Sequence, residues 1–155
     1  NFLITELKNK QLDITKKRMY LRLLIHLVGD IHQPLHVGRF EDLGGNRIRV
    51  SWFGDSTNLH SVWDEKIIES QKLSYTEYVA AINHTTKEER KNWQAQPINE
   101  WFYESYLLAG KDYGSVTPAT ARLSFRYNFD HIEMLNDQLL KAGVRLAGLL
   151  NSIFG

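Results

Sequence analysis

Two histidine–aspartate pairs with the same spacing are the first chemical feature of this sequence. His26 precedes Asp30 by four residues, and His60 precedes Asp64 by four residues. Residues four apart lie on one face of a helix, so an imidazole and a carboxylate with this spacing can bind the same cation. His36 lies just after a proline that must end the first helix, where the chain can turn back and supply a third ligand.

A single pair of this kind is commonly a surface hydrogen bond, but two pairs with a third histidine between them favour a metal site. Asp30 follows the apolar residues Leu27 and Val28. Burial of a bare carboxylate there would be costly unless it were paired or bound to a metal. Nitrogen and oxygen ligands without a thiolate favour zinc, ahead of manganese or iron.

The other three histidines carry weaker signals. His32 is separated from His36 by the same proline, so the two do not share a helical face, and we expect His32 to support a ligand or make a structural hydrogen bond. His84 lies in a polar run and is expected in a loop. His131 stands beside acidic residues at the start of a helix, which predicts a solvated side chain.

Composition is that of one ordinary globular domain spanning residues 1–155. Hydrophobic residues make up 43% and charged residues 24%, with no linker or internal repeat. The net charge of +1 excludes a polycationic tail, so any nucleic acid must be bound at a local site. The lack of cysteine excludes disulfides, thiolate zinc sites and cysteine nucleophiles. No apolar run reaches the roughly 18 residues that span a bilayer, so we expect no membrane partner.

Helical periodicity predicts the elements that would position the histidines. We expect helices over residues 16–30, 59–70, 74–83, from 97 to 110 or beyond, and 118–154 with a break near Asn128. The apolar residues of the first helix are Met19, Leu23, Ile25, Leu27 and Val28. The predicted N-terminal caps are Thr15 for the first helix, Asn58 or Thr57 for the second, and Ser74 with Glu77 as a capping box for the third.

One segment follows a different pattern. Turn-forming residues occupy positions 42–46, and Ile48, Val50 and Trp52 then alternate with polar residues. This arrangement predicts a short β-hairpin or irregular loop near residues 38–54. The predicted fold class is therefore mainly α with one small β element.

Three motifs together resemble a known family. They are the segment from His26 to His36, the run Gly44-Gly45-Asn46, and the segment from Asn58 to Trp63-Asp64. In this order they are similar to the core of the zinc-dependent single-strand nucleases of the S-one/P-one type, which are related to the bacterial zinc phospholipases C. Residues 142–151 resemble the last helix of that family, so the resemblance covers nearly the whole chain.

The resemblance implies a mainly helical fold with three zinc ions in a cleft, two of them close together. Asp30 would be the catalytic carboxylate that bridges the close pair, whose ions share a hydroxide. His26 would bind one ion of that pair. The separate zinc would be held by His36, His60 and Asp64.

The resemblance also implies a substrate and a reaction. Family members hydrolyse the 3′-oxygen–phosphorus bond of single-stranded DNA or RNA, release 5′-mononucleotides, and act as 3′-nucleotidases. Gly44 and Asn46 match a loop that contacts the nucleobase. Members carry export signals, which implies a periplasmic or secreted location.

The family's remaining zinc ligands have no counterpart here. The family uses an N-terminal tryptophan, a histidine soon after it, and a further aspartate and histidine from upstream helices. Residues 1–25 contain no histidine, and Asp13 is their sole aspartate. We therefore expect a C-terminal part of a longer nuclease, with one complete three-ligand site, weak or absent activity alone, and the missing N-terminal segment as a partner.

Three alternatives stay open at this point. The first is a phospholipase C-like zinc phosphodiesterase, against which the base-contacting loop at Gly44 argues. The second is a non-catalytic helical domain stabilised by one metal ion. The third is a plain helical bundle that carries its histidine–aspartate pairs on the surface.

Overall fold

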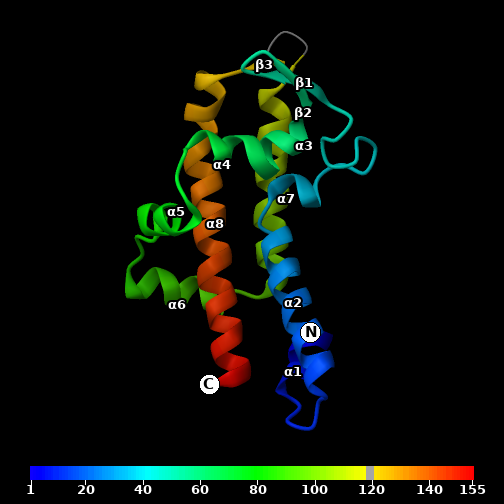
Figure 1. The fold of residues 1–155 in the computed structure, drawn as a ribbon, viewed down its shortest axis with the longest axis vertical. Coiled ribbons are helices and arrows are strands. Elements are labelled where there is room, and N and C mark those ends of the chain that lie inside the picture. Colours follow the sequence, from blue (N-terminus) through cyan, green and yellow to red (C-terminus); the bar gives the residue numbers. More distant parts are fainter. Residues whose placement is uncertain (118–120) are drawn as a thin grey trace.

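Two long helices and a small sheet form the frame of the molecule (Figure 1). The computed structural model describes residues 1–117 and 121–155. α7 (Ile98–Ser115) and α8 (Phe125–Phe154) run along the long axis, and the sheet lies at one end. α1 (Phe2–Lys8) and α2 (Ile14–Asp30) contact each other and α8 towards the other end. The predicted fold class, mainly α with one small β element, is confirmed.

α2 begins two residues earlier than predicted, and its cap is different. Asp13 caps the helix instead of Thr15, because its carboxylate accepts hydrogen bonds from the backbone amides of Thr15 (2.9 Å) and Lys16 (3.1 Å). These amides lie in the first turn, where no backbone carbonyl of the helix can reach them. The helix ends at Asp30, as predicted.

The apolar residues of α2 do not all face a core. Leu24 and Val28 are buried against residues of α1 and α8. The other apolar residues that the periodicity identified are between 42% and 55% exposed: Met19, Leu23, Ile25 and Leu27. Asp30 is 34% exposed as well. The burial of Asp30 is therefore partial and not complete as expected, because the described elements cover one side of α2 only.

The β element is a three-stranded sheet. β1 (Arg49–Trp52) pairs antiparallel with β2 (Asp55–Asn58), and the tight turn between them contains Phe53 and Gly54, both with positive φ. The hairpin therefore lies later than predicted, and residues 42–46 form a loop before it. β3 (Arg122–Leu123) adds a parallel partner to β1. Its short pairing comes from tertiary contact and has no signal in the local sequence.

The predicted helix over residues 59–70 is present but changes pitch twice. It consists of α3 (Leu59–Ser61), a π-helical turn (Val62–Lys66) and α4 (Ile67–Ser70). Asn58 is the cap, as predicted, because its Oδ1 accepts the backbone amide of Ser61 at 2.8 Å. A π-helical turn widens the helix by one residue, a feature found frequently at functional sites.

Two short helices lie on the outer side of α8 (Figure 1). α5 (Tyr75–Ile82) has the predicted capping box of Ser74 and Glu77. α6 (Lys87–Ala95) was not predicted, although Thr86 begins a second capping box of the same type before it. The sequence therefore contains a local signal for the start of α6.

The last two helices differ from prediction at their ends. Pro97 is the N-cap of α7 and does not occupy its first helical position. α8 runs through Asn128 without the predicted break. The helical spacing of the apolar residues in this segment predicts that Phe125 is buried, but it is 79% exposed. The predicted start of this helix at Pro118 lies outside the described residues.

Two hydrophobic clusters hold these elements together. The larger one joins the sheet, α3, the π-helical turn, α7 and α8, and includes Leu59, Val62, Trp63 and Ile67. The smaller one joins α1, α2 and the distal part of α8 around Trp101. Within residues 1–117 and 121–155, no helix combines the length and the apolar character needed to cross a bilayer.

Candidate metal centre

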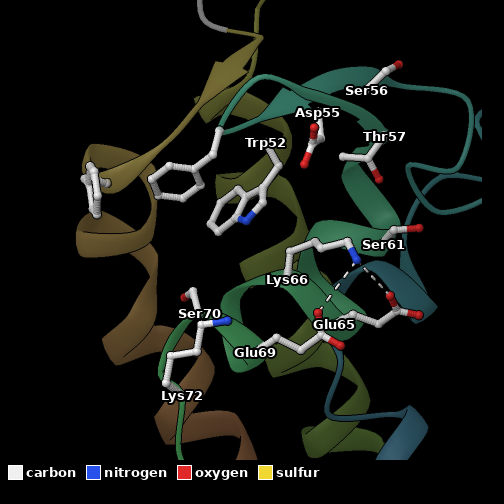
Figure 2. Close-up of a pocket in the computed structure, with 12 residues that line it drawn as sticks. Trp52, Asp55, Ser56, Thr57, Ser61, Glu65, Lys66, Glu69, Ser70 and Lys72 are labelled. Atoms are coloured by element: carbon white, nitrogen blue, oxygen red, sulfur yellow. Dashed lines mark hydrogen bonds and ion pairs between the residues drawn. The ribbon is translucent and has the colours of Figure 1, made fainter.

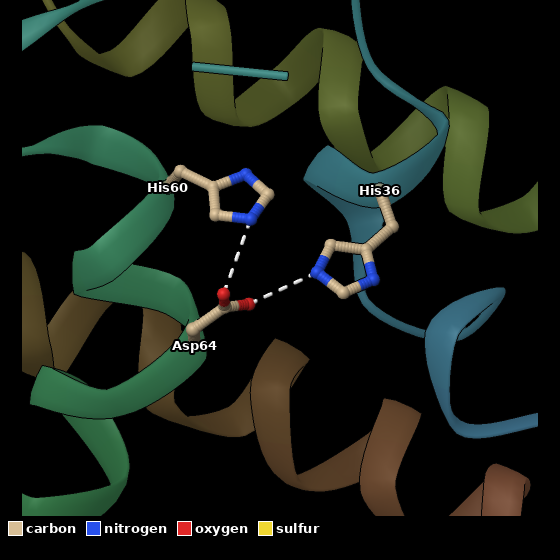
Figure 3. A group of neighbouring side chains, drawn as sticks. All are labelled: His36, His60 and Asp64. Carbon is tan, nitrogen blue, oxygen red and sulfur yellow. Dashed lines mark hydrogen bonds and ion pairs between the residues drawn. The ribbon is translucent and has the colours of Figure 1, made fainter. Parts of the chain in front are cut away.

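Three of the predicted ligands converge around one carboxylate (Figure 3). His36 Nε2 lies 3.1 Å from Asp64 Oδ1, and His60 Nε2 lies 3.1 Å from Asp64 Oδ2. One donor atom from each residue lies within 4.8 Å of the others. The two imidazole rings are nearly parallel, with centroids 5.0 Å apart. Two nitrogens and a carboxylate oxygen at such separations form a donor set that zinc accepts.

Local structure explains how these side chains meet. His60 lies on α3, and Asp64 lies one turn later on the π-helical turn, so both project from one side of the helix. Leu59 and Trp63, the residues just before them, are buried in the core and fix the rotation of that helix. His36 comes from a 3-10 turn, Pro34–Val37, that reverses the chain after α2.

The second nitrogen of His60 has a partner that orients the ring. Nδ1 of His60 donates a hydrogen bond to the backbone carbonyl of Gly44 at 2.7 Å. A carbonyl can only accept, so Nδ1 carries the proton and Nε2 faces Asp64. Gly44 has a φ of +62°, and a Cβ atom there would lie 2.3 Å from the carbonyl oxygen of Leu35. The loop therefore needs glycine at this position.

The electrostatics of the cluster favour an ionised carboxylate. Although partial burial opposes ionisation, hydrogen bonds from His36, His60 and Gln33 hold the pKa of Asp64 well below its ordinary value. The same contact with Asp64 raises the pKa of His60. The cluster is thus a negative group surrounded by imidazoles, which could exchange their protons for a cation.

The other two predicted ligands extend this group into a chain of contacts. Asp30 Oδ1 lies 3.4 Å from Nδ1 of His36, and Asp30 Oδ2 lies 3.1 Å from Nε2 of His26. His26 is two-thirds exposed. Among the residues that the structure describes, the metal-compatible group contains His36, His60 and Asp64, and no third ligand joins His26 and Asp30. The division of these five residues into one complete and one partial zinc site stays a prediction.

The predicted base-contacting loop lies at the edge of this cluster. A cleft of about 550 Å³ is lined by residues that include Asp30, His36, Gly44 and His60. Asn46 is exposed, and its side-chain amide donates to the carbonyl of Leu43 at 2.9 Å. The contact of Gly44 and Asn46 with a nucleobase stays a prediction.

His32 has structural hydrogen bonds instead of contacts with the predicted ligands. It is 3% exposed, its Nδ1 donates to the carbonyl of Val28 at 2.7 Å, and its Nε2 accepts from Arg145 at 2.9 Å. Burial lowers the pKa of His32 to about 4, so the ring is neutral at pH 7. His32 could therefore support a metal ligand, as predicted, only through the backbone of the turn in which it lies.

The expectation for His131 is wrong, whereas His84 lies in a loop as predicted. The side chain of His131 is 12% exposed and stacks on Tyr127 with a centroid distance of 3.9 Å. Tyr127 donates a hydrogen bond to the buried carboxylate of Asp112, which lies on α7. The polar residues next to His131 in sequence predict a solvated side chain, but the side of α8 that carries His131 faces α7.

A larger cavity lies elsewhere, between the hairpin and the helix of residues 59–70 (Figure 2). It measures about 720 Å³. Lys66 lies between Glu65 (3.3 Å) and Glu69 (3.7 Å), and Asp55 adds a further acidic group. The described residues that line the cavity include three carboxylates and two lysines, Lys66 and Lys72, but no histidine. The cavity therefore lacks the imidazole ligands of the His–Asp cluster, which is the candidate centre.

Comparison with known proteins settles the family. Residues 1–155 match the family model described as S1/P1 Nuclease. The chain belongs to the S1/P1 nuclease family. It is 38% identical to Endonuclease 3 of Arabidopsis thaliana over 150 aligned positions, which cover 86% of this chain and 51% of that protein. It is 31% identical to Nuclease P1 of Penicillium citrinum over 157 positions, which cover 87% and 57%.

A third relative matches over a shorter part of the chain. Nuclease S1 of Aspergillus oryzae is 45% identical over 60 positions, which cover 39% of this chain and 21% of that protein. This S1/P1 chain thus spans about half the length of the curated relatives it matches. The resemblance drawn from the His–Asp motifs is confirmed at the level of the family.

Proposed function

We propose that this chain supplies the histidine–aspartate part of a zinc-dependent nuclease that hydrolyses single-stranded DNA and RNA to 5′-mononucleotides, with 3′-nucleotidase activity. The observation that carries this proposal is the convergence of His36, His60 and Asp64 from two separate segments within 4.8 Å. The relatives named as nucleases support the reaction class.

The residues present fit zinc. His36, His60 and Asp64 would hold one ion, and His26 with Asp30 would contribute to the close pair. When bound, zinc polarises phosphoryl oxygens and lowers the pKa of water, so that a nucleophile is available at neutral pH. The protein orients these ligands in advance, because the Gly44 carbonyl fixes His60.

The side chains that line the cleft beside the cluster support the proposal of a single-stranded substrate. Phe40 is 88% exposed and Leu43 is 49% exposed, and both line the cleft with Gly44. An unpaired base can stack on an aromatic ring, whereas a base inside a duplex is not accessible in this way. The guanidinium of Arg39 lies 4.3 Å from the ring of Tyr113 at the same edge and could contact a phosphate.

We further propose that the isolated chain is weak or inactive, because the described residues give His26 and Asp30 no third ligand. The part of the relatives' length that this chain does not match would complete the paired site. From the family resemblance we also propose a periplasmic or secreted location.

The experiment is a product analysis with zinc, a single-stranded oligonucleotide, its duplex form and a phosphatidylcholine substrate. We expect slow release of 5′-mononucleotides from the single strand alone, its loss in His60→Ala, and no change in His84→Ala, which alters an exposed loop histidine. Release of phosphocholine instead would favour the phospholipase C-like alternative. Zinc binding without hydrolysis, even with the unmatched half of Endonuclease 3 added in trans, would favour a non-catalytic domain.

A further inference from the structure

The short turn after α2 connects two of the predicted ligands and is held by buried side chains. Residues 31–33 lie between Asp30 at the end of α2 and the 3-10 turn that carries His36. The carbonyl oxygen of Ile31 accepts a hydrogen bond from the hydroxyl of Ser105 on α7. The carbonyl oxygen of His32 accepts one from Nε2 of Gln138 on α8 at 3.0 Å. Two consecutive carbonyls of the turn are thus bound by two different helices.

Ser105 and Gln138 act as one unit. Nε2 of Gln138 also donates to Oγ of Ser105 at 3.0 Å, so the amide binds the turn both directly and through the hydroxyl. Ser105 is fully buried, and Gln138 is 3% exposed. Water cannot replace these hydrogen bonds readily, so the loss of either donor would leave a buried carbonyl without its partner.

The amide of Gln138 has a feature that packing does not explain. Its Oε1 is buried and has no hydrogen-bond partner among residues 1–117 and 121–155. An unpaired buried acceptor is unfavourable, and a leucine or methionine would fill the same space without it. The donor atom of this side chain therefore has a use that offsets the unpaired oxygen, and its two acceptors both lead to the turn.

The ring of His32 is held from the same two helices. Arg145 on α8 donates to Nε2 of His32 at 2.9 Å and lies 2.7 Å from Glu104 on α7. The arginine side chain is fully buried. The turn is therefore fixed both at its backbone and at its one buried ring.

We propose that Ser105 and Gln138 are positioning residues for the metal centre. By binding the carbonyls of Ile31 and His32, they set the direction in which the chain leaves α2 and thereby hold Asp30 and His36 at their observed separation of 3.4 Å. Their hydrogen bonds go to the turn and to each other, and not to the side chains of the predicted ligands. The consequence for zinc rests on the proposed function, whereas the consequence for the order of the turn does not.

The test uses Ser105→Ala and Gln138→Leu, which remove the donors with little change in volume. The control is Ser152→Ala, because Oγ of Ser152 also donates to a backbone carbonyl, that of Leu149, at 2.8 Å, near the C-terminal end of α8. Two quantities are measured at a temperature where all variants are folded: amide hydrogen exchange in the metal-free protein, and zinc affinity by competition with a chromophoric chelator.

We expect faster exchange confined to the amides of residues 31–36 in both variants, and zinc affinity reduced by about tenfold or more. The control should leave both quantities at their wild-type values. A cobalt(II) absorption spectrum gives a further sign, since an altered ligand geometry changes its bands and a simple loss of stability does not. If Gln138→Leu fails to fold, Ser105→Ala and the milder Gln138→Met carry the test.

The outcomes separate the two proposals. Unchanged exchange at residues 31–36 together with a lowered Tm would overturn the positioning role and leave Ser105 and Gln138 as structural residues. Wild-type protein that binds no zinc would overturn the proposed metal centre, and the exchange data would still decide whether these residues order the turn. Faster exchange with unchanged zinc affinity would overturn their link to the metal centre.

Discussion

Asp30 and His36 face each other across the turn after α2, with Oδ1 of the carboxylate 3.4 Å from Nδ1 of the imidazole. The opposite ring nitrogen, Nε2, points to Asp64. A carboxylate on one nitrogen of a metal-binding histidine fixes the ring and increases its basicity. Asp30 therefore has two potential uses here, as a ligand of its own and as the group that orients His36.

Replacement of His60 should remove the complete zinc site. We expect about one zinc ion per dialysed wild-type chain, and none in His60→Ala, because two ligands bind the ion too weakly to survive dialysis. Elemental analysis measures this directly, and His84→Ala serves as the control. Retention of zinc by His60→Ala would show that the ion is bound elsewhere.

The orienting role of Asp30 predicts a graded effect. Asp30→Asn should keep the zinc stoichiometry of the chain and weaken its zinc affinity by roughly 10- to 100-fold, since a neutral amide replaces the negative charge beside the His36 ring. A chelator competition titration measures the affinity. Asp55→Asn, a neutralised aspartate on the exposed strand β2, should have the affinity of wild type. Equal affinities for the two variants would contradict the role.

The loop at Gly44 offers a comparison between two glycines. Both Gly44 and Gly54 have positive φ, but a Cβ atom at Gly44 would clash with the Leu35 carbonyl, whereas Gly54 has open space. Gly44→Ala should therefore lose more stability than Gly54→Ala in urea unfolding. It should also weaken zinc binding, because it displaces the carbonyl that holds His60. A larger loss in Gly54→Ala would show that backbone strain outweighs the contact.

The buried carboxylate of Asp112 predicts a pH-dependent stability. Burial raises its pKa, although hydrogen bonding to Tyr127 and the nearby His131 oppose this shift. The protonated carboxyl of Asp112 contributes its full stability below the pKa that it has in the unfolded chain, about 4. This contribution is lost as the pH rises through the higher pKa that Asp112 has in the folded protein. Wild type should therefore lose stability relative to Asp112→Asn from pH 4 to pH 7.

Urea unfolding of both proteins at several pH values measures that difference. It should grow by about 1.4 kcal/mol for every pH unit between the unfolded and folded pKa values. The asparagine retains an oxygen that accepts the Tyr127 hydroxyl. A difference that is constant from pH 4 to pH 7 would mean that Asp112 has an ordinary pKa. A His131→Gln background separates the contribution of the neighbouring imidazole, whose Nε2 lies 3.9 Å from Oδ1 of Asp112.

Local features of the sequence were sufficient for much of the fold and for the choice of candidate ligands. Pro34 ends α2, Asn58 caps α3, and Ser74 with Glu77 caps α5, because each of these effects acts within a few residues of the chain. The spacing of His60 and Asp64 likewise follows from helical geometry alone. The capping box that begins at Thr86 likewise indicates the start of α6 from neighbouring residues alone.

Tertiary contact decided the rest. His36 contacts Asp64, which lies 28 residues away in sequence, and His32 contacts Arg145, which lies 113 residues away. A pattern of neighbouring residues therefore cannot predict either contact. The exposure of one side of α2 and the burial of the His131 side chain depend on which elements pack against each helix. The sequence therefore determined which residues could form a centre, and the packing of α7 and α8 around one turn decided how they meet.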